Sequence, residues 1–382
     1  MLHELRECGI GGQVGRWLAS FLDPTTRQQA VAVDGRVSSL SPVISGVPQG
    51  TVLGPILFLI HIRNIARGLS ESTSASSFAD DTRVQKGIAS VGDCEALQQD
   101  LQLIYQWADH VNMKFNSEKF ECLRYWSDPS KAPDYQYLAP DKQDIKVKSE
   151  LRDLGVQLSS SLNFKVHIEH TITAASRLVG WGLRTFRGRG RKVMLTLLKS
   201  LVQPKLDYCS QLWSPSDQSS INKLESIQRN LVSHIRDTKL NSLNYWEKLK
   251  ELRIFSQERR RERYIIIFLW KISQGMVSGY DVNFTLDGTR RGRFIVPKSI
   301  VRSAPASVRN AREGSLGVKG ARIFNLLPES LRGLNSGHVD YFKNHLDVFL
   351  ENIPDQPTVP GLGRGAESNS LIHQLPLFYS LT

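Results

Sequence analysis

Two adjacent carboxylates, Asp80 and Asp81, are the side chains best suited to chemistry in this chain. They follow the strand-like run Ser77-Phe78-Ala79 and precede another, Thr82 to Gln85, so the pattern predicts a hairpin with Ala79 to Asp81 at its turn. Two like charges repel, and a place where both stay ionised usually holds a cation. Hard divalent ions such as Mg²⁺ prefer one or two carboxylates together with substrate phosphates. Two such ions about 4 Å apart can hold the attacking and leaving oxygens of a phosphoryl transfer.

An Asp-Asp pair is weak evidence for a metal site when it stands alone. At the aspartate content of this chain an adjacent pair is expected by chance. Aspartates also favour turns because their side chains form hydrogen bonds with nearby backbone. The interpretation therefore depends on the other motifs and on their order along the chain.

The charge of the chain is unevenly distributed. The net charge is +12, of which residues 1–160 carry −3, residues 161–270 carry +11 and residues 271–382 carry +4. A basic block of this kind suggests a polyanionic partner, either nucleic acid or an anionic membrane, although a merely solvated basic surface has the same composition. The 382 residues, with 40% hydrophobic and 23% charged side chains, are enough for two or three globular domains.

The sequence predicts a protein inside the cell, in the nucleus or the cytoplasm. Its four cysteines are too widely spaced for a zinc-ligand pair, and we expect reduced thiols. No apolar core follows a basic start at the N-terminus, so we expect no signal peptide. The longest apolar run, Val52 to Ile60, is about half a membrane span long and contains Gly54-Pro55. It should form a buried helix, and we expect no transmembrane segment and no membrane partner.

Apolar periodicity predicts a mixed first part and a helical second part of the chain. In the first part we expect helices at 2–8, 14–22 and 93–111, the last capped by Asp93, and strands at 29–33, 36–40, 120–125 and 151–158. Asp34-Gly35 is a strong hairpin signal between two of these strands. In the second part we expect helices at 164–182, 193–202, 220–235, 245–252 and 257–272.

Two loops have compositions suited to binding. In Ser45-Gly46-Val47-Pro48-Gln49-Gly50-Thr51 two glycines and a proline force a tight turn directly before the apolar helix. The free N–H groups of such a helix start can bind an anion or a base edge, although an ordinary strand-to-helix loop can have the same sequence pattern. The second loop, between two predicted helices, can contact phosphates or be simply solvated. Its basic residues are Arg184, Arg187, Arg189, Arg191 and Lys192.

The last hundred residues divide into a further segment and a tail. Residues 285–350 begin with Arg290, Arg291 and Arg293, continue with a predicted strand from Phe294 to Pro297, and end in a helix from Val339 to Leu350. Residues 354–382 are rich in Pro, Gly and Ser, so we expect them to form a flexible tail.

Four motifs occur in order along the chain: the sequence from Ser45 to Pro55, Phe78-Ala79-Asp80-Asp81, Phe115-Asn116-x-x-Lys119, and Leu154-Gly155-Val156. Taken together, they resemble the reverse transcriptase of non-LTR (LINE-type) retrotransposons. They occur in the family's order and at about its spacing. The likeness covers roughly residues 1–270, and residues 285–350 also resemble the carboxyl end of jockey- or CR1-like elements.

The resemblance implies an α+β fold built around a partial polymerase palm, an antiparallel sheet with helices. Residues 1–160 would be this palm, lacking the fingers and the first catalytic strand. Residues 161–275 would form a helical, basic thumb, which agrees with the distribution of charge. Residues 285–350 would be a small C-terminal segment, and residues 354–382 the flexible tail.

The resemblance also implies roles for individual residues. Asp80 and Asp81 match the metal-binding hairpin, and Lys119 matches the lysine that protonates the leaving pyrophosphate. The residues that match the surface against the template and the nascent base pair are Gly46, Val47, Pro48, Gln49, Gly50 and Phe78. Leu154, Gly155 and Val156 match the primer grip, and the basic loop would contact the nucleic-acid backbone. The cofactor would be Mg²⁺ or Mn²⁺, and the partners would be an RNA template, a DNA primer and dNTP.

Departures from the family pattern lead us to expect an inactive chain with weak metal binding. The family's other metal-binding carboxylate precedes the helix that resembles Leu2 to Cys8, so we expect a truncated palm. His61-Ile62-Arg63-Asn64-Ile65 also stands where relatives usually read Tyr-Ile-Asn-Asp-Leu. Three hypotheses stay open: part of an RNA-directed DNA polymerase that acts only in a longer chain or with a complementing fragment, a non-catalytic module that binds RNA or an RNA–DNA hybrid, and a non-functional or untranslated transposon fragment.

Overall fold

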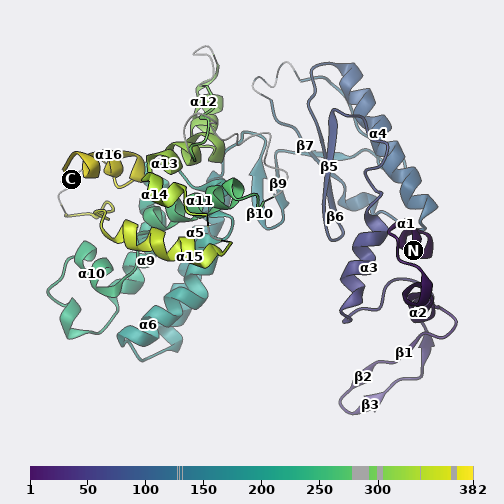
Figure 1. Ribbon diagram of the computed structural model, residues 1–382, viewed down its shortest axis with the longest axis horizontal. Helices are drawn as coiled ribbons and strands as arrows, with labels where there is room; N and C mark the ends of the chain where they lie inside the picture. The colour runs from purple at the N-terminus through teal and green to yellow at the C-terminus, as the bar shows by residue number, and fades with distance from the viewer. Residues whose placement is uncertain are drawn as a thin grey trace. The chain divides into compact units, whose positions relative to one another are not determined.

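The chain folds into two units in the computed structural model (Figure 1). The structure describes residues 1–382 except 127, 129, 131, 278–291, 299–303, 336, 363–367 and 382. The N-terminal unit comprises Met1–Cys122 and Ser130–Val147, and the C-terminal unit comprises Leu123–Pro129 and Lys148–Thr382. The boundary near residue 147 lies before the end at residue 160 that we expected for the first domain.

The N-terminal unit combines helices with short strand pairs. Its helices are α1 (Leu2–Glu7), α2 (Gly12–Leu22), α3 (Leu53–Ile62), α4 (Val91–His110) and the 3-10 turn η1 (Ser117–Lys119). Its strands are β1 (Gln28–Gln29), β2 (Ala32–Val33), β3 (Arg36–Val37), β4 (Ser41–Pro42), β5 (Thr73–Phe78), β6 (Asp81–Lys86), β7 (Glu121–Leu123) and β8 (Lys146–Lys148), the last two reaching the unit boundary. The mixture confirms the α+β class.

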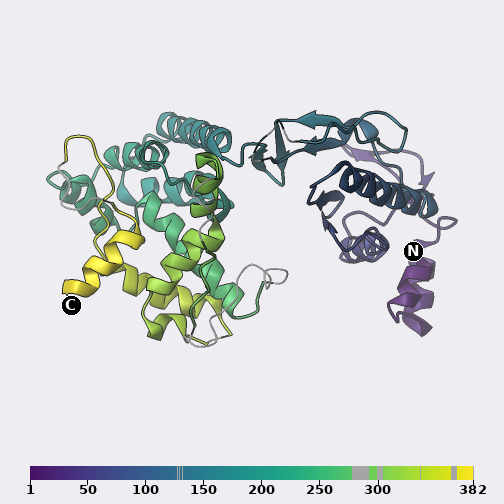
Figure 2. The ribbon, with the colours of Figure 1, turned by 90° about the horizontal axis from the view of Figure 1, so that it is seen from above.

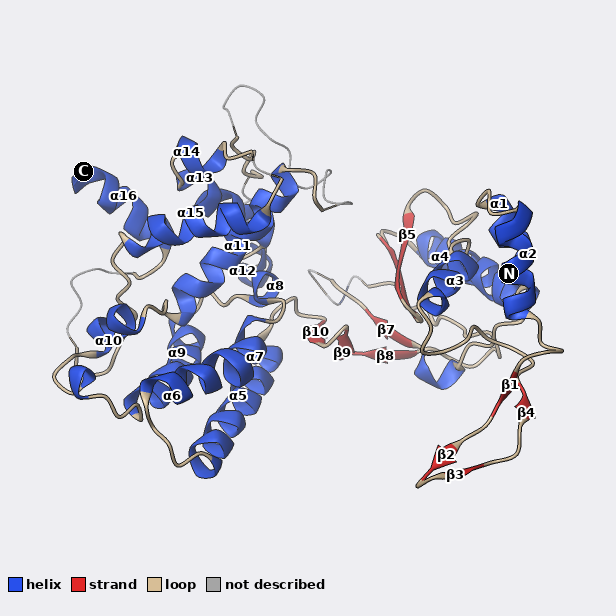
Figure 3. Cartoon of the chain, turned by 60° about the horizontal axis from the view of Figure 1, so that its bottom comes forward, coloured by secondary structure: helices blue, strands red, loops and turns tan. Residues whose placement is uncertain are grey.

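The strands of the described residues pair only two by two, as Figure 3 shows in red. The pairs are β1 with β4, β2 with β3, β5 with β6, β7 with β8, and β9 (Glu150–Asp153) with β10 (Val156–Ser159). We expected an antiparallel sheet of palm type, and no described sheet is wider than two strands. The sequence of β5, Thr-Ser-Ala-Ser-Ser-Phe, explains part of the difference, because it offers few large apolar side chains for packing beneath a broad sheet.

Local sequence signals account for two hairpin turns and for the start of α4. Asp34 and Gly35 both have positive φ, 49° and 77°, as the favoured two-residue hairpin turn requires. The segment expected as one strand at 151–158 is itself a hairpin, because Leu154 and Gly155 turn the chain with φ of 43° and 87°. Helix α4 starts at a capping box in which Ser90 is the N-cap and Asp93 the third helical residue, so our assignment of Asp93 as the cap was wrong.

Small apolar clusters hold the N-terminal unit together. Leu5, Leu18 and Leu57 join α1, α2 and α3. The apolar run expected to be a fully buried helix does form α3, but Ile56 is 51% exposed and Leu59 is 56% exposed. A helix in a small unit packs by one face only, so its opposite apolar face stays at the surface.

The C-terminal unit is helical beyond the β9–β10 hairpin (Figure 2, teal to yellow). Its first helices are α5 (Lys165–Thr185), α6 (Arg191–Leu197), the π-helix η3 (Leu198–Val202), α7 (Gln203–Asp207), α8 (Ser210–Trp213), α9 (Gln218–Ser233), η4 (Thr238–Leu240), α10 (Tyr245–Leu252) and α11 (Gln257–Ser273). The later ones are α12 (Ala306–Glu313), the π-helix η5 (Leu316–Gly320), α13 (Ala321–Leu326), α14 (Glu329–Arg332), α15 (Val339–Glu351) and α16 (Leu371–Leu381). The helices expected between residues 164 and 272 are present, with shifted ends.

Helix α11 belongs to the core that it shares with the chain's last helices. The indole of Trp270 stacks on Phe342 of α15 with ring centroids 4.5 Å apart, and Phe324 of α13 lies in the same cluster. The described part of residues 285–350 therefore packs with α11 instead of forming a separate segment. Arg290 and Arg291 lie outside the described residues.

The stretch Phe294 to Pro297, expected to be a strand, does not form one in the structure. The side chain of Asn325 takes the place of a neighbouring strand, because it accepts a hydrogen bond from Phe294 N at 2.9 Å and donates one to Phe294 O at 2.8 Å. The aromatic ring of Phe294 is buried against Phe324.

The expectation of a flexible tail is wrong for the last described residues. Leu371 and Leu375 of α16 are fully buried in the same cluster as Trp270. Glu262 of α11 accepts hydrogen bonds from Ser370 Oγ and, at 2.8 Å, from Leu371 N, and so caps the start of α16. Composition alone did not show that this segment has a buried partner.

None of the described helices has both the length and the apolar character that a membrane span requires.

Glu225 of α9 is a buried carboxylate that joins three helices. It accepts hydrogen bonds from Tyr245 Oη of α10 at 2.5 Å and from Gln257 N of α11 at 2.7 Å. Burial raises the pKa of Glu225 to about 7, although both hydrogen bonds act in the opposite direction. From this raised pKa we expect the stability of the fold to depend on pH.

Stability should fall as the pH rises from about 4.5 to about 7. In this interval the unfolded carboxyl of Glu225 has lost its proton while the folded one keeps it, so the folded state binds more protons. One carboxyl shifted by this amount contributes about 3 kcal/mol. Glu225→Gln should remove this part of the pH dependence. Burial also raises the pKa of Glu258 to about 7, and the contribution of Glu258 to the pH dependence should remain in this variant.

Urea unfolding of the full chain at several pH values between 4.5 and 8 measures this dependence. Glu169→Gln, at an exposed position of α5, is the matched control. A Glu225→Gln variant with the same pH dependence as the wild type and the control would contradict the assignment.

Candidate active site

The carboxylates Asp80 and Asp81 lie at the exposed tip of the β5–β6 hairpin. Phe78 pairs with Asp81, so these two side chains share one face of the hairpin, and Ala79-Asp80 form the two-residue turn. Ala79 has a φ of 51°, in the left-handed region that few residues other than glycine adopt. The ring of Phe78 is 67% exposed. The tip therefore presents two oxygen-rich side chains and one aromatic ring to solvent.

The opposite end of the hairpin is tied to α4 by Asp100. This carboxylate accepts hydrogen bonds from Ser70 N at 2.9 Å, Ser70 Oγ at 2.7 Å and Thr73 Oγ1 at 2.5 Å. Thr73 pairs with Lys86 at the hairpin base, and Lys86 Nζ donates to Ser70 Oγ at 3.0 Å. Burial alone would raise the pKa of Asp100, but the hydrogen bonds from Thr73 and Ser70 and the charge of Lys86 outweigh it and lower the pKa.

An aromatic cluster brings the segment of Lys119 to the same hairpin. Tyr105 of α4 makes edge contacts with Phe115 and Phe120, whose ring centroids lie 6.1 and 5.9 Å away. Val84 of β6 packs against the same cluster. Lys119 lies between the two phenylalanines on the 3-10 turn η1, where Asn116 Oδ1 accepts from Glu118 N at 3.1 Å. The Lys119 side chain is exposed.

The Gly46–Gly50 loop is folded tightly onto the start of α3. Thr51 Oγ1 donates to Pro48 O at 2.9 Å and accepts from Gly54 N at 3.1 Å. A Cβ at Gly54 would lie 2.7 Å from Pro48 O, so only glycine allows this close approach. Val47 packs with the α1–α3 cluster, whereas Gln49 is exposed. The loop thus lies in the same unit as Asp80 and Asp81 but on a different apolar cluster.

The hairpin of Leu154, Gly155 and Val156 belongs to the C-terminal unit and is fixed there by two side chains. Tyr208 Oη donates to Leu154 O at 2.6 Å, and its ring is so close to Gly155 that an added Cβ would lie 3.3 Å from it. His167 Nδ1 of α5 accepts from Gln157 N at 3.2 Å. Burial, helped by the charges of His170 and Arg152, lowers the pKa of His167 and so favours the neutral ring that can accept this bond.

The five basic residues of the second loop have different environments. Arg189 donates from its guanidinium to Leu183 O, and Arg191 NH1 donates to Glu251 Oε1 at 3.0 Å. The guanidinium groups of Arg189 and Arg191 therefore already have partners within the protein. Arg184, Arg187 and Lys192 are exposed and take part in no ion pair among the described residues. Sequence composition did not separate the two sets, because Glu251 is 60 residues away from Arg191 along the chain.

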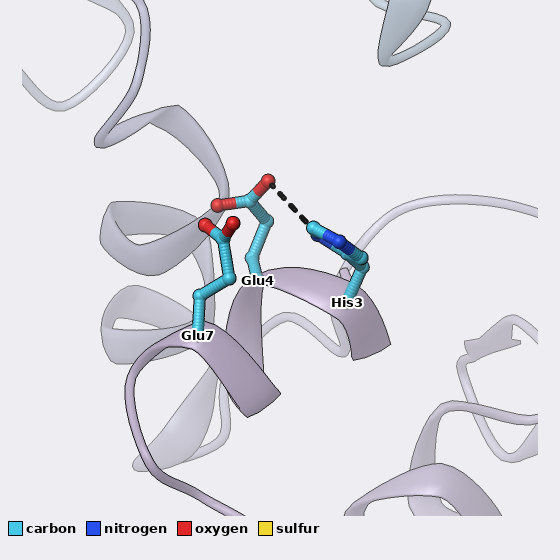
Figure 4. A group of neighbouring side chains, drawn as sticks. All are labelled: His3, Glu4 and Glu7. Carbon is cyan, nitrogen blue, oxygen red and sulfur yellow. Dashed lines mark ion pairs between the residues drawn. The ribbon is translucent and has the colours of Figure 1, made fainter.

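A second acidic group, at the N-terminus, has the composition of a metal site. Ligand atoms of His3, Glu4 and Glu7 lie within 4.8 Å of one another (Figure 4). Arg63 already binds both glutamates, however, with Nε 3.0 Å from Glu4 Oε2 and NH2 in contact with Glu7. Asn64 Nδ2 also donates to Glu4 Oε2 at 2.8 Å. The group therefore forms an ionic clamp between α1 and the end of α3. Arg63 and Asn64, which belong to the stretch from His61 to Ile65 that departs from the family pattern, supply the other half of this clamp.

The residues that position the candidate site were missed by sequence reasoning. Asp100 lies among the apolar positions Leu97, Leu101 and Ile104 of α4, and an acid on that stripe was the available signal. For Tyr208 and His167 the sequence offers no comparable signal, because their partners depend on the tertiary fold.

Comparison with known proteins finds a family model and several relatives. A family model described as reverse transcriptase (RNA-dependent DNA polymerase) matches residues 2–158. An "RNA-directed DNA polymerase from mobile element jockey" of Drosophila melanogaster is 27% identical over 226 residues, covering 56% of this chain and 24% of the relative. A "Probable RNA-directed DNA polymerase from transposon X-element" of the same species is 25% identical over 222 residues, with the same coverage.

A third relative is a "Retrovirus-related Pol polyprotein from type-1 retrotransposable element R1" of Bradysia coprophila. It is 27% identical over 176 residues, covering 45% of this chain and 17% of the relative. The chain thus matches about a quarter or less of the length of these curated relatives.

Asp100→Asn should loosen the β5–β6 hairpin. The amide cannot replace a carboxylate that accepts three hydrogen bonds, and hydrogen bonds to charged groups contribute about 1.5–3 kcal/mol each. We expect a loss of about 2–4 kcal/mol in the free energy of opening the hairpin base, measured as faster amide hydrogen exchange at residues 73–86. Asp109→Asn, on an exposed position of the same helix, should leave this exchange unchanged. Equal exchange in both variants would show that Asp100 does not hold the hairpin.

Proposed function

The chain carries a reverse transcriptase domain related to those of non-LTR retrotransposons, and on this premise we propose that Asp80 and Asp81 are the metal ligands of an RNA-directed DNA polymerase palm. The single observation that carries the proposal is the pair itself. The two carboxylates stand exposed at the tip of a hairpin whose base is tied down, inside the segment that the family model matches.

The donor set suits Mg²⁺ or Mn²⁺, because both are hard ions that prefer carboxylate oxygens. A bound ion would polarise a phosphoryl oxygen and orient the attacking and leaving groups. The protein contributes the carboxylates and their support, since Asp100 and the aromatic cluster hold the hairpin while the tip stays open to a substrate. Lys119, on the segment attached to the same cluster, is the proposed proton donor to the leaving pyrophosphate.

The remaining site residues are assigned from the same family resemblance. Phe78 and the Gly46–Gly50 loop, with Gln49 exposed, would face the template and the incoming dNTP. The Leu154–Val156 turn would support the primer, and Tyr208 and His167 would hold that turn in place. The helical segment at residues 161–275 would be the thumb, with Arg184, Arg187 and Lys192 available to the nucleic-acid backbone.

A non-catalytic nucleic-acid-binding protein is the second candidate function. Among the described residues, the only group of three or more potential metal ligands is His3, Glu4 and Glu7, so no third ligand joins Asp80 and Asp81. Two adjacent carboxylates alone hold Mg²⁺ weakly, because this ion keeps its waters unless the geometry is near ideal. The basic surface of the C-terminal unit does not depend on such a site.

Binding of Mn²⁺ tests the assignment of the two aspartates. The double variant Asp80→Asn with Asp81→Asn should weaken Mn²⁺ binding by about tenfold or more, equivalent to about 1.4 kcal/mol. Electron paramagnetic resonance of free Mn²⁺ in a titration measures the affinity. Asp34→Asn is the matched control, since Asp34 is also an exposed aspartate at a two-residue hairpin turn with positive φ. If the control lowers the affinity as much as the double variant, the pair is not the site.

The chain by itself should not extend a primer. Removal of preorganised charge stabilisation at one point can cost a factor of about 10²–10³ in rate, and among the described residues no third metal ligand joins Asp80 and Asp81. Labelled nucleotide incorporation on a primed RNA template, with Mg²⁺ or Mn²⁺, is the assay. Incorporation that disappears in Asp80→Asn would show that the chain assembles a working site and would exclude the non-catalytic candidate.

A further inference from the structure

One continuous part of the C-terminal unit contains no acidic residue. Residues 170–206 include eight lysines and arginines and neither aspartate nor glutamate. The segment runs through most of α5, the basic loop, α6 and η3. Such a separation of charge exceeds what solubility requires, because surfaces usually mix both signs.

The exposed face of α5 combines this charge with aromatic rings. Arg177, Trp181 and Arg184 are spaced at i, i+4 and i+7 and so lie on one face of the helix. Trp181 is 45% exposed and Phe186, just beyond the helix, is 39% exposed, and their ring centroids lie 5.8 Å apart at an interplanar angle of 85°. The opposite face of α5 supplies the buried residues Ala175 and Val179 to the core. The aromatic pair is therefore not needed to fill that core.

The cations around the aromatic pair are not neutralised within the described residues. Arg177, Arg184, Arg187 and Lys192 are exposed and have no ion pair there, whereas Arg191 and Arg189 are bound to Glu251 and to the backbone. Guanidinium groups bind phosphate well, and exposed aromatic faces bind the faces of unpaired bases. The same surface thus offers both kinds of contact that a nucleic-acid strand makes.

We propose that Trp181 and Phe186, flanked by Arg177, Arg184 and Arg187, form a binding site for unpaired nucleic acid. The bases stack on the aromatic rings and the phosphates lie against the guanidinium groups. The proposal rests on the proposed nucleic-acid function and adds to it the class of strand: a single strand with free base faces, because the bases of a duplex are already stacked on one another. An anionic membrane fits less well, since this face of α5 alternates arginine with single aromatics and has no broad apolar stripe.

Fluorescence anisotropy of the full chain with a labelled single-stranded RNA and with a blunt duplex of the same length tests the proposal. Trp181→Ala should lower the affinity for the single strand by about 5-fold to 100-fold and leave the affinity for the duplex nearly unchanged. Trp181→Tyr, which keeps an aromatic face, should retain most of the single-strand affinity. Circular dichroism checks that the variants fold.

Trp17→Ala is the matched control. Trp17 of α2 is also an exposed tryptophan, 56% accessible, with its ring stacked on Phe21 at 5.4 Å, and α2 carries a single arginine, Arg16. This variant should bind the single strand as the wild type does. A triple variant Arg177→Gln, Arg184→Gln, Arg187→Gln should weaken both substrates and flatten the dependence of affinity on salt.

The outcomes separate this proposal from the function on which it rests. If the chain binds both nucleic acids and Trp181→Ala changes neither affinity, the stacking site is wrong while nucleic-acid binding stands. If the wild type binds neither, both are wrong. A loss in Trp181→Ala that appears only with phosphatidylserine vesicles and not with RNA would assign the surface to a membrane and overturn the proposal.

Discussion

Burial of a carboxylate costs free energy unless hydrogen bonds compensate for the lost water, and this constraint organises both units. Three buried acidic side chains, Asp100, Glu225 and Glu262, and the half-buried Asp355 accept hydrogen bonds from segments that are distant in sequence. Asp100 holds the base of the β5–β6 hairpin, Glu225 caps α11, Glu262 caps α16, and Asp355 accepts from Ser256 N at 2.7 Å and Ser256 Oγ at 2.6 Å. Each bond joins a helix to a chain segment that could otherwise open.

The same constraint explains how an exposed acid pair can be well positioned. Asp80 and Asp81 lie at the tip, where a substrate and an ion can approach, while the restraints lie at the base and along one side of the hairpin. The hairpin of Leu154 and Gly155 follows this arrangement in the C-terminal unit, where Tyr208 and His167 restrain an exposed turn. In both places hydrogen bonds with neighbouring helices fix the backbone, and the turn itself stays exposed.

Local sequence predicted what depends on near neighbours. The hairpin at Asp80-Asp81, the turn at Asp34-Gly35 and the helix that became α10 follow from turn residues, caps and apolar spacing, all within a few positions. Contacts across long separations were not predictable in this way. The burial of Leu371 and the pairing of Arg191 with Glu251 depend on partners 60 residues away or more. The candidate acids were found because a motif carries them, whereas Asp100, which holds their hairpin, belongs to no motif.

The proposed polymerase function requires that a primer end meet the protein at the tip of the β5–β6 hairpin. A DNA primer with a photoreactive 4-thiothymidine at its 3′ end, annealed to an RNA template, tests this directly when the full chain is irradiated in the presence of Mg²⁺ and the linked peptide is identified by mass spectrometry. We expect links within residues 73–86, centred on Phe78 to Asp81. Links confined to the His3–Glu7 clamp, or spread along the basic helices with none in the hairpin, would contradict the proposed function.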